Sequence, residues 1–442
     1  MIAPRPRLVL WTALLAVPCG LVVAAEPSML LVCALALGLF AVLAIADAAL
    51  SVKRLAGVQA SLPEVTRLTR GREGAIPILF ANTQRSRRRI RMALAWPPEL
   101  TSREPLLEAI LPEDAGAARI EWPCIARARG RYALENVYIE TTSVLGFWAT
   151  RRVSPTFGQV RVYPNVLEER RRLAGLFLNQ GNTGLHAQRQ VGKGREFEKL
   201  REYIPGDSYE EIHWKATAKR GKPVTKVFQL ERTQEVYVVI DASRLSGRDV
   251  GLSATNQLER FLVAALLLGQ VAERQGDLFG IAAFDEQVRA FVRARNGRAH
   301  YNACREALYT LEPRLVNPDF GEVFSFLRMH LRRRALVIFL TSLDDPLLAE
   351  QFVAQLDVLA RRHLVLINML ARPGIEPLFS KPHVSSADDV YARLGGHIQW
   401  RRLQALEKVL ARRGVAMTLL DDERMCAELV SQYINVKRRQ AL

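Results

Sequence analysis

The chain lacks the residue patterns on which most catalytic and metal sites depend. Its five cysteines form no C-x-x-C pair, and its seven histidines form no H-E-x-x-H motif. No G-x-S-x-G nucleophile elbow occurs either. His213 stands beside Trp214 as an ordinary polar residue, and Cys304 lies in a predicted helix without an activating group. We therefore predict a protein that is not an enzyme, with isolated cysteines typical of a reducing compartment.

A phosphate-binding loop is also missing. Residues 192–194 read Gly-Lys-Gly where a Ser or Thr must follow the lysine, and position 187 is alanine where the loop needs glycine. Residues 221–223 read Gly-Lys-Pro and fail in the same way. The chain therefore carries no P-loop ATPase motif of its own.

Positive charge is abundant. The chain has 62 Lys and Arg against 45 Asp and Glu, a net charge of +17 that would attract nucleic acid, anionic lipid or acidic partners. The arginine-rich run 85–89 has no interleaved aromatic residues on which bases could stack. We expect it to be a solvated loop or a lipid headgroup contact, and we expect no nucleic-acid partner.

Long apolar runs dominate the first fifty residues. Runs over 8–25 and 29–50 are each long enough to cross ~30 Å of hydrocarbon at ~1.5 Å per residue. Only residues 26–28 separate them. The pattern predicts a transmembrane hairpin over 1–54. Asp47, near the end of the second run, is expected close enough to the interface to be solvated.

Basic residues flank both apolar runs, with Arg5 and Arg7 before the first and Lys53 and Arg54 after the second. The positive-inside rule predicts that both ends of the hairpin, and hence both termini, lie in the cytoplasm. A signal peptide cleaved near 24–25 is an alternative for the first run, although the second run would still anchor the product.

Two further regions follow the hairpin. Residues 55–165 show short alternating runs broken by glycine, proline and charge, which predict a β-sandwich. Over 235–442, apolar strands such as 236–240 and 335–340 alternate with helical patterns, the last two helices near 398–412 and 423–435. This α/β pattern predicts a parallel sheet with helices on both faces.

The segment between these regions, 166–234, carries the most distinctive motif. It reads Gly-Arg-Glu-Phe at 194–197, Leu-Arg-Glu-Tyr at 200–203, Pro-Gly-Asp at 205–207 and Trp-Lys-Ala-Thr-Ala-Lys at 214–219. This block, followed by a strand ending in Asp241, resembles the domain-of-unknown-function 58 family. Members of that family are membrane-anchored proteins with a von Willebrand A-like domain. Leu-Gly-Phe at 145–147 also resembles the family.

The resemblance implies a partner. Such proteins are usually encoded beside a MoxR-type AAA+ ATPase and are thought to assist it in assembly or maturation of client proteins. The partner-binding candidates in the motif are Arg201, Tyr203, Asp207, Trp214 and Lys215. Packing in a core is the plainer alternative for Trp214, and a turn position is the plainer one for Asp207.

The resemblance also implies a metal-ion-dependent adhesion site, which would hold Mg²⁺ through oxygen ligands. Asp241 and Ser243 match its first loop, but Ser246 comes one place late and Asp344 is displaced on the third loop. We therefore expect a degenerate site. The alternative is that Asp241 and Ser243 cap the following helix and bond backbone amides.

These features together predict a binding or adaptor protein of the bacterial inner membrane. It would have two spans and face the cytoplasm, and it would work with a MoxR-type ATPase on an unidentified client. The alternative is an envelope scaffold whose basic surface binds anionic membrane lipid without an ATPase.

Overall fold

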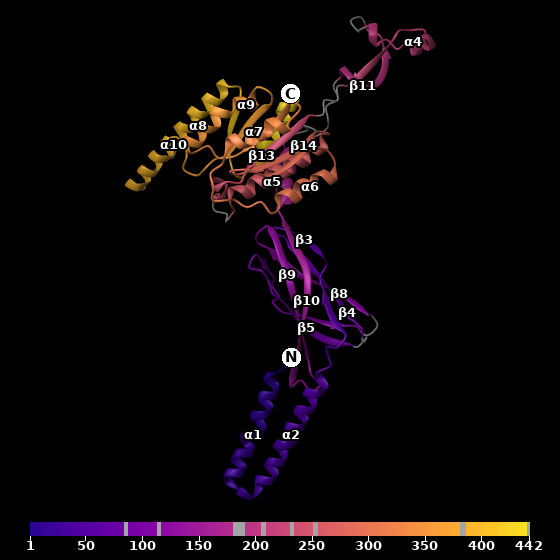
Figure 1. Cartoon of the computed structure of the whole chain (residues 1–442), viewed down its shortest axis with the longest axis vertical. Helices are drawn as coiled ribbons and strands as arrows, with labels where there is room; N and C mark the ends of the chain where they lie inside the picture. The colour runs from indigo at the N-terminus through magenta and orange to yellow at the C-terminus, as the bar shows by residue number, and fades with distance from the viewer. Residues whose placement is uncertain are drawn as a thin grey trace. The chain divides into compact units, whose positions relative to one another are not determined.

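The computed structural model describes residues 1–83, 87–112, 116–179, 191–204, 209–229, 234–250, 255–380 and 386–439. The chain forms two compact units, Met1–Asn165 and Val166–Leu442. Figure 1 labels their elements along the chain.

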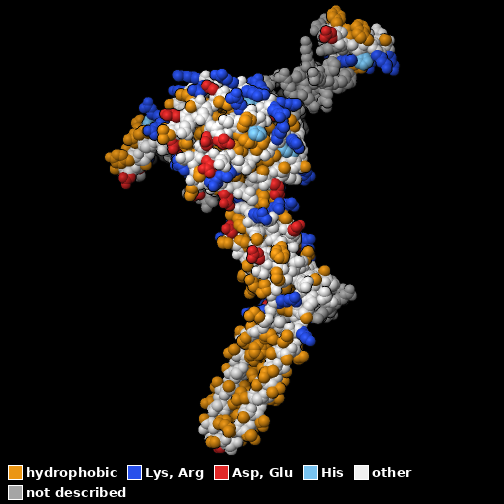
Figure 2. All heavy atoms as spheres, viewed as in Figure 1, with side chains coloured by type: hydrophobic (Ala, Val, Ile, Leu, Met, Phe, Trp, Pro, Cys, Tyr) orange, Lys and Arg blue, Asp and Glu red, His pale blue; other side chains and the backbone are white. Residues whose placement is uncertain are grey.

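The first unit begins with two apolar helices. Helix α1 spans Pro6–Ala25, and a short 3₁₀ turn, η1 (Pro27–Met29), leads into α2 (Leu30–Ser51). The two helices lie side by side, and Figure 2 shows hydrophobic side chains along their whole length. Both are long and apolar enough to span a membrane, and almost none of their surface is covered by protein.

The rest of this unit is a β-sandwich, as predicted. One sheet has the order β1-β10-β9-β5-β7, with β3 also paired to β10, and the other has the order β2-β4-β8-β6. The core between them holds Ile78, Phe80 and Trp122 of one sheet against Ile90 and Val137 of the other. The strands are β1 (Ile2–Pro4), β2 (Val58–Ser61), β3 (Val65–Thr69), β4 (Glu73–Asn82), β5 (Arg88–Leu94), β6 (Leu100–Thr101), β7 (Leu107–Leu111), β8 (Ala117–Ala126), β9 (Gly130–Thr142) and β10 (Trp148–Tyr163).

The amino terminus belongs to the sandwich. Strand β1 pairs antiparallel with β10, matching Ile2 to Thr150 and Pro4 to Trp148. The terminal ammonium of Met1 donates to the Arg151 carbonyl at 3.0 Å. The residues before the first apolar helix therefore join a sheet whose other strands all come after the second.

The second unit is an α/β domain built on a six-stranded sheet of order β15-β14-β13-β16-β17-β18. All neighbouring pairs are parallel except β14 and β15. A turn of three residues joins that pair, and a connection so short requires antiparallel strands. The strands are β13 (Glu235–Asp241), β14 (Leu278–Phe284), β15 (Val288–Arg295), β16 (Ala335–Leu340), β17 (Leu364–Leu370) and β18 (Ala416–Leu420).

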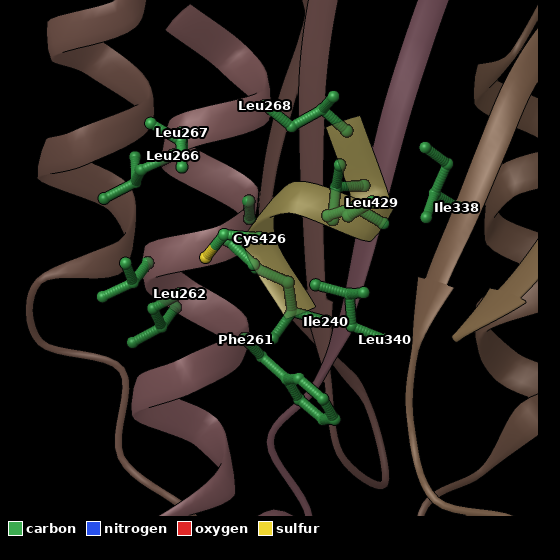
Figure 3. Packing of buried hydrophobic residues seen from close by; sticks show 14 of the residues in the cluster. Ile240, Phe261, Leu262, Leu266, Leu267, Leu268, Ile338, Leu340, Cys426 and Leu429 are labelled. Carbon is green, nitrogen blue, oxygen red and sulfur yellow. The ribbon is translucent and has the colours of Figure 1, made fainter. Parts of the chain in front are cut away.

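Helices cover both faces of this sheet. Val236, Val238 and Ile240 point to one face, where α3, α5, α6 and α11 pack; Tyr237 and Val239 point to the other, beneath α7–α10. Figure 3 shows the first layer, with side chains of β13 and β16 meeting those of α5 and α11. The helices are α3 (Val166–Asn179), α5 (Gln257–Arg274), α6 (Arg298–Leu308), α7 (Phe320–His330), α8 (Pro346–Gln355), α9 (Asp357–Ala360), α10 (Ala387–Arg412) and α11 (Met425–Arg438).

Helix α10 begins about a dozen residues before the predicted start near 398. Ser386 caps it by accepting a hydrogen bond from the Asp389 amide, and Asp388 and Asp389 occupy its first turn. Only Leu403 and Leu410 of this helix are buried. Its first half is therefore not amphipathic, and the hydrophobic pattern did not indicate a helix there.

Between α3 and β13 the chain forms a small element that we call the signature arm. It consists of the hairpin β11 (Val191–Glu202) and β12 (Val224–Gln229), a 3₁₀ turn η2 (Tyr209–Glu211) and the short helix α4 (Trp214–Arg220). Ile212 and Val224 are buried in it. The arm lies within the segment that carries the family motif.

We expect Phe352→Ala in α8 to destabilise the α/β domain by about 3–5 kcal/mol, because truncating a packed aromatic leaves a cavity. The Phe352 ring meets those of Phe320, Phe324 and Phe339 at centroid distances of 4.9, 5.1 and 5.6 Å. Denaturant unfolding of the detergent-purified chain measures the loss.

Phe379→Ala is the matched control, because the Phe379 ring is 92% exposed. It should change the unfolding free energy by less than about 0.5 kcal/mol. Equal effects of the two substitutions would contradict the packing of this layer.

Candidate functional site

The candidate site lies at the carboxyl edge of the α/β sheet, where β13 and β16 end side by side. Asp241 is the last residue of β13, and the 3₁₀ turn η3 (Arg244–Gly247) follows it. Thr341 and Ser342 follow β16 directly. Because parallel strands end at the same edge, this is where an open α/β sheet gathers polar groups.

Asp241 is fully engaged by protein donors. Its Oδ1 accepts a hydrogen bond from the Ser243 amide at 2.8 Å, and its Oδ2 accepts one from the Thr341 hydroxyl at 2.7 Å. Burial raises the pKa of the Asp241 carboxyl; hydrogen bonds from Ser243 and Thr341 oppose the rise, and the nearby charge of Asp285 adds to it. The carboxylate thus ties the end of β13 to the residue after β16.

The two serines of the predicted loop behave differently. The Ser246 hydroxyl donates to the Ser243 carbonyl at 2.8 Å and closes the turn. The Ser243 hydroxyl lies close enough to Asp241 to lower the pKa of that carboxyl. The hydroxyl is nevertheless buried and has no hydrogen-bond partner in the part of the chain that the structure describes. Ser243 precedes η3 without capping it through its side chain. Of the two residues in the capping alternative, only Asp241 bonds a backbone amide through its side chain.

Asp344 is held by arginines. Arg248 and Arg372 each place Nη1 at 2.6 Å from its Oδ2. The Asp344 side chain is almost wholly buried, whereas both guanidinium groups are partly exposed. Arg248 follows η3 and Arg372 follows β17, so one carboxylate joins three loops of this edge. Asp344 and Arg372 also line a small pocket with an apolar floor of Met369, Ile375 and Leu403.

A further buried acid, Asp285, lies at the end of β14, and the sequence analysis did not single it out. Its Oδ1 accepts from the Gln287 amide at 3.0 Å, and its Oδ2 accepts from Arg289 at 2.7 Å. Arg314 lies 3.5 Å from the same oxygen. The available signal was its position, since Asp285 directly follows an apolar strand, as Asp241 follows the apolar run 236–240.

This donor set does not fit Mg²⁺. A hard divalent cation needs several free oxygens in near-octahedral array. Both Asp241 oxygens already accept protein hydrogen bonds. Asp344 Oδ1 has no hydrogen-bond partner among the described residues, but the two arginines on Oδ2 would repel a metal ion there. Among the residues that the structure describes, no three His, Cys, Asp or Glu side chains are placed to hold a metal. The edge instead presents guanidinium groups fixed by buried carboxylates, an arrangement suited to carboxylates of a partner.

The partner-binding candidates lie on the signature arm. Trp214, the first residue of α4, is 69% exposed, so the core-packing alternative is wrong. Lys215 beside it is exposed. Arg201 is half-buried in β11, and the ring of Tyr203 lies 6.0 Å from that of Tyr209. Asp207 falls outside the described residues.

Local interactions account for the form of the arm around Trp214. His213 caps α4 by accepting the Ala216 amide at 3.0 Å on Nδ1, which gives it the structural role expected of it. Gly221 ends the helix in the left-handed conformation with φ 66°, where residues with a Cβ are strained. The Thr217 hydroxyl accepts the Val224 amide at 3.0 Å and fastens α4 to β12. The His213 cap, the turn at Gly221 and the Thr217 hydrogen bond thus fix the position of α4, and Trp214 is left exposed to solvent.

Two more apolar side chains of the arm, Ile204 and Tyr209, are exposed and were missed in the sequence analysis. Together with Trp214 we call them the arm aromatic-apolar group. Large apolar side chains left in solvent on so small an element are typical of binding surfaces, in which tryptophan and tyrosine are enriched.

Comparison with known families confirms the resemblance drawn from the motif. A family model described as "Protein of unknown function DUF58" matches residues 199–374, from the signature arm through β17. Uncharacterized proteins of Mycobacterium tuberculosis (strain H37Rv) and Mycobacterium bovis are 25% identical over 177 residues. The alignment covers 40% of this chain and 54% of each relative, so the chain spans about half the length of the curated relatives it matches.

Solved structures give a fainter likeness. The von Willebrand A domain of SpRpn10 matches 45% of this chain and 95% of its own, at 10% identity and a TM-score of 0.29. Proximal thread matrix protein 1 from the mussel byssus matches 46% of each chain, at 11% identity and a TM-score of 0.26. The α/β fold of the second unit is defined by its sheet order and its two layers of helices. Structural likenesses with TM-scores this low carry no argument about it.

We expect Mg²⁺ and Mn²⁺ to give the same heats with the wild-type chain and with Asp241→Asn in isothermal titration calorimetry. The reason is that Asp241 has no free oxygen to offer an ion. A saturable heat in the wild type that Asp241→Asn abolishes would restore the metal site.

Asp241 should also give the stability of the domain a measurable pH dependence. Because its folded-state pKa lies above the unfolded value, its contribution is fully present below the unfolded pKa and is lost as pH rises through the folded pKa. Asparagine keeps the shape without the charge. The unfolding free energy of Asp241→Asn relative to wild type should therefore increase as pH is raised from the acid range toward neutrality. A difference independent of pH would contradict the burial of a charged group.

Proposed function

We propose that the chain is a membrane-anchored binding protein that presents its signature arm and α/β domain to a partner protein. The observation that carries this proposal is the exposure of Trp214 at the start of α4. A tryptophan in solvent is unfavourable for the free protein and is the side chain most enriched where one protein anchors another.

A MoxR-type AAA+ ATPase is the partner that the family resemblance supports. The chain lacks a phosphate loop, so an ATP-driven process in which it takes part requires a second protein to bind the nucleotide. Trp214 and the exposed Lys215 would then contact the ATPase, and the arginine edge around Asp344 would be free for the client.

Location in the bacterial inner membrane, with both termini in the cytoplasm, is supported by the hairpin and its flanks. Strand β1 pairs with β10, so the residues before α1 and the domain after α2 belong to one sandwich. If the helices span the bilayer, this pairing requires both ends of the hairpin on one side. Basic residues at both ends favour the cytoplasmic side.

The second candidate, an envelope scaffold that binds anionic lipid, has one observation in its favour. Three arginines converge on the chain just after α2: Arg54 donates to the Thr142 carbonyl at 2.6 Å, Arg152 to the Leu55 carbonyl at 3.1 Å, and Arg88 to the Arg54 carbonyl. They would lie at headgroup depth, where each basic residue adds attraction to anionic lipid.

Trp214→Ala should weaken the affinity for the ATPase about thirtyfold, because a hot-spot residue contributes about 2 kcal/mol to binding. Less ATPase should then be recovered with the chain. The measurement is co-purification of the full chain from detergent in the presence of a non-hydrolysable ATP analogue. Tyr391→Ala on α10 is the matched control, because the Tyr391 ring is equally exposed, at 72%, and lies outside the arm.

Equal losses from the two substitutions would contradict the role of the arm. Recovery of no AAA+ protein, together with salt-sensitive binding of the chain to anionic vesicles, would favour the scaffold instead.

A further inference from the structure

The Leu-Gly-Phe motif at 145–147 lies in the turn between β9 and β10, and the proposed function makes no use of it. This turn, 143–148, packs against α2. The Leu145 amide donates to Asp47 Oδ1 at 3.0 Å, and the Trp148 indole N–H donates to the Ala44 carbonyl at 2.8 Å. The rings of Phe147 and Phe40 meet edge to face at 5.6 Å. Asp47, expected to be solvated, is instead 2% exposed.

The same turn also contacts the start of α1. The Arg5 amide donates to the Phe147 carbonyl at 2.9 Å. Gly146 has φ 79°, and a Cβ at this position would lie 3.3 Å from Nη1 of Arg7. Glycine therefore serves both the left-handed backbone and the close approach of the arginine. The turn is held by both helices of the hairpin.

The contacts place the turn below the end of α2. Ala44 precedes Ser51, the last residue of α2, by seven residues and Phe40 precedes it by eleven, which correspond to ~10 Å and ~16 Å along a helix. A hydrocarbon layer needs ~20 residues of helix, and α2 has 22. If the hairpin spans the bilayer with Arg5 and Arg7 at the headgroups, the turn lies at the outer edge of the hydrocarbon, because it contacts both the start of α1 and residues 40–47 of α2.

The turn is chemically suited to that depth. Several of its polar backbone groups are paired: Ser143 N–H donates to the Trp148 carbonyl at 2.8 Å, and Trp148 N–H donates to the Ser143 hydroxyl at 2.9 Å. Pairing of this kind lowers the cost of placing non-helical backbone at the edge of the hydrocarbon. The side chains left outward are apolar, with Val144 65% and Leu145 50% exposed, and they continue the apolar surface of α2.

We propose that the turn 143–148 is a third membrane-inserted element, which enters the bilayer beside α2 with Val144 and Leu145 against the lipid acyl chains. This inference rests on the proposed membrane anchor. It gives the anchor a specific form, because the sandwich is then joined to the membrane through the turn as well as through the two helix ends. Such a joint resists tilting of the sandwich, which a pair of flexible connections would allow.

Fluorescence quenching in vesicles tests the insertion. The full chain, with Cys19→Ala and Cys33→Ala to remove the cysteines of the helices, is labelled with an NBD fluorophore at Val144→Cys. It is then reconstituted into phosphatidylcholine and phosphatidylglycerol vesicles with and without doxyl-labelled acyl chains. Leu39→Cys on the exposed side of α2 is the positive control. Phe157→Cys, 93% exposed and nine residues along β10 from Trp148, is the negative control, ~30 Å away.

The expected result is blue-shifted emission at position 144 with a loss of intensity in doxyl lipid close to that at position 39, and no loss at position 157. Quenching at 39 without quenching at 144 would overturn the inference while leaving the anchor intact. The same holds for a blue shift at 144 that doxyl lipid does not quench, since a protein would then cover the turn. Absence of quenching at 39 would overturn the anchor itself, and the inference with it.

Discussion

Burial of β13 on both faces is the constraint on which the α/β domain depends. Every residue from Val236 to Ile240 is inaccessible to water or nearly so, and a strand of this kind is stable only between two layers of helices. Its next residue is an acid, so the strand carries a carboxylate into an apolar site. That carboxylate must be bonded, and Thr341 and the Ser243 amide are placed to do so. The fold of the edge follows from this requirement.

Because the buried Asp241 carboxylate must be hydrogen-bonded by the protein, this edge of the sheet differs from a metal site. A carboxylate that holds its neighbours together cannot also supply free oxygens to an ion. Asp285 is likewise occupied, and Asp344 pairs with two arginines through Oδ2 while its Oδ1 is buried without a hydrogen-bond partner in the described ranges of the chain. The loops of the edge are therefore joined by ion pairs within the chain, in which the carboxylates are buried and the guanidinium groups partly exposed. A partner meeting this surface would encounter positive charge held in fixed positions, without a cation as intermediary.

The sequence predicted the parts of the molecule that depend on local pattern. Apolar strands such as 335–340, the buried helix α5 and the two membrane-length helices were visible because their periodicity or length is distinctive. The arginines on Asp344 were not, since Arg248 lies 96 residues away in the chain and Arg372 lies 28 away. The exposure of Trp214 was also beyond reach, because a tryptophan awaiting a partner and one packed in a core look alike in sequence. Asp47 was misjudged for a similar reason: its partner, Leu145, is 98 residues further on.

The pairing of β1 with β10 imposes an order on the folding of the sandwich during synthesis. Ile2–Pro4 find their place in the sheet only after β10 has been synthesised, some 150 residues later. During that interval β1 has no partner strand, and if the helices span a membrane, residues 2–4 must stay on the side where the sandwich folds. Proteolytic removal of α1 would take β1 with it and leave the backbone groups of Trp148–Thr150 unpaired at a sheet edge. Retention of the first helix, and of β1 before it, is thus a condition for a complete sheet.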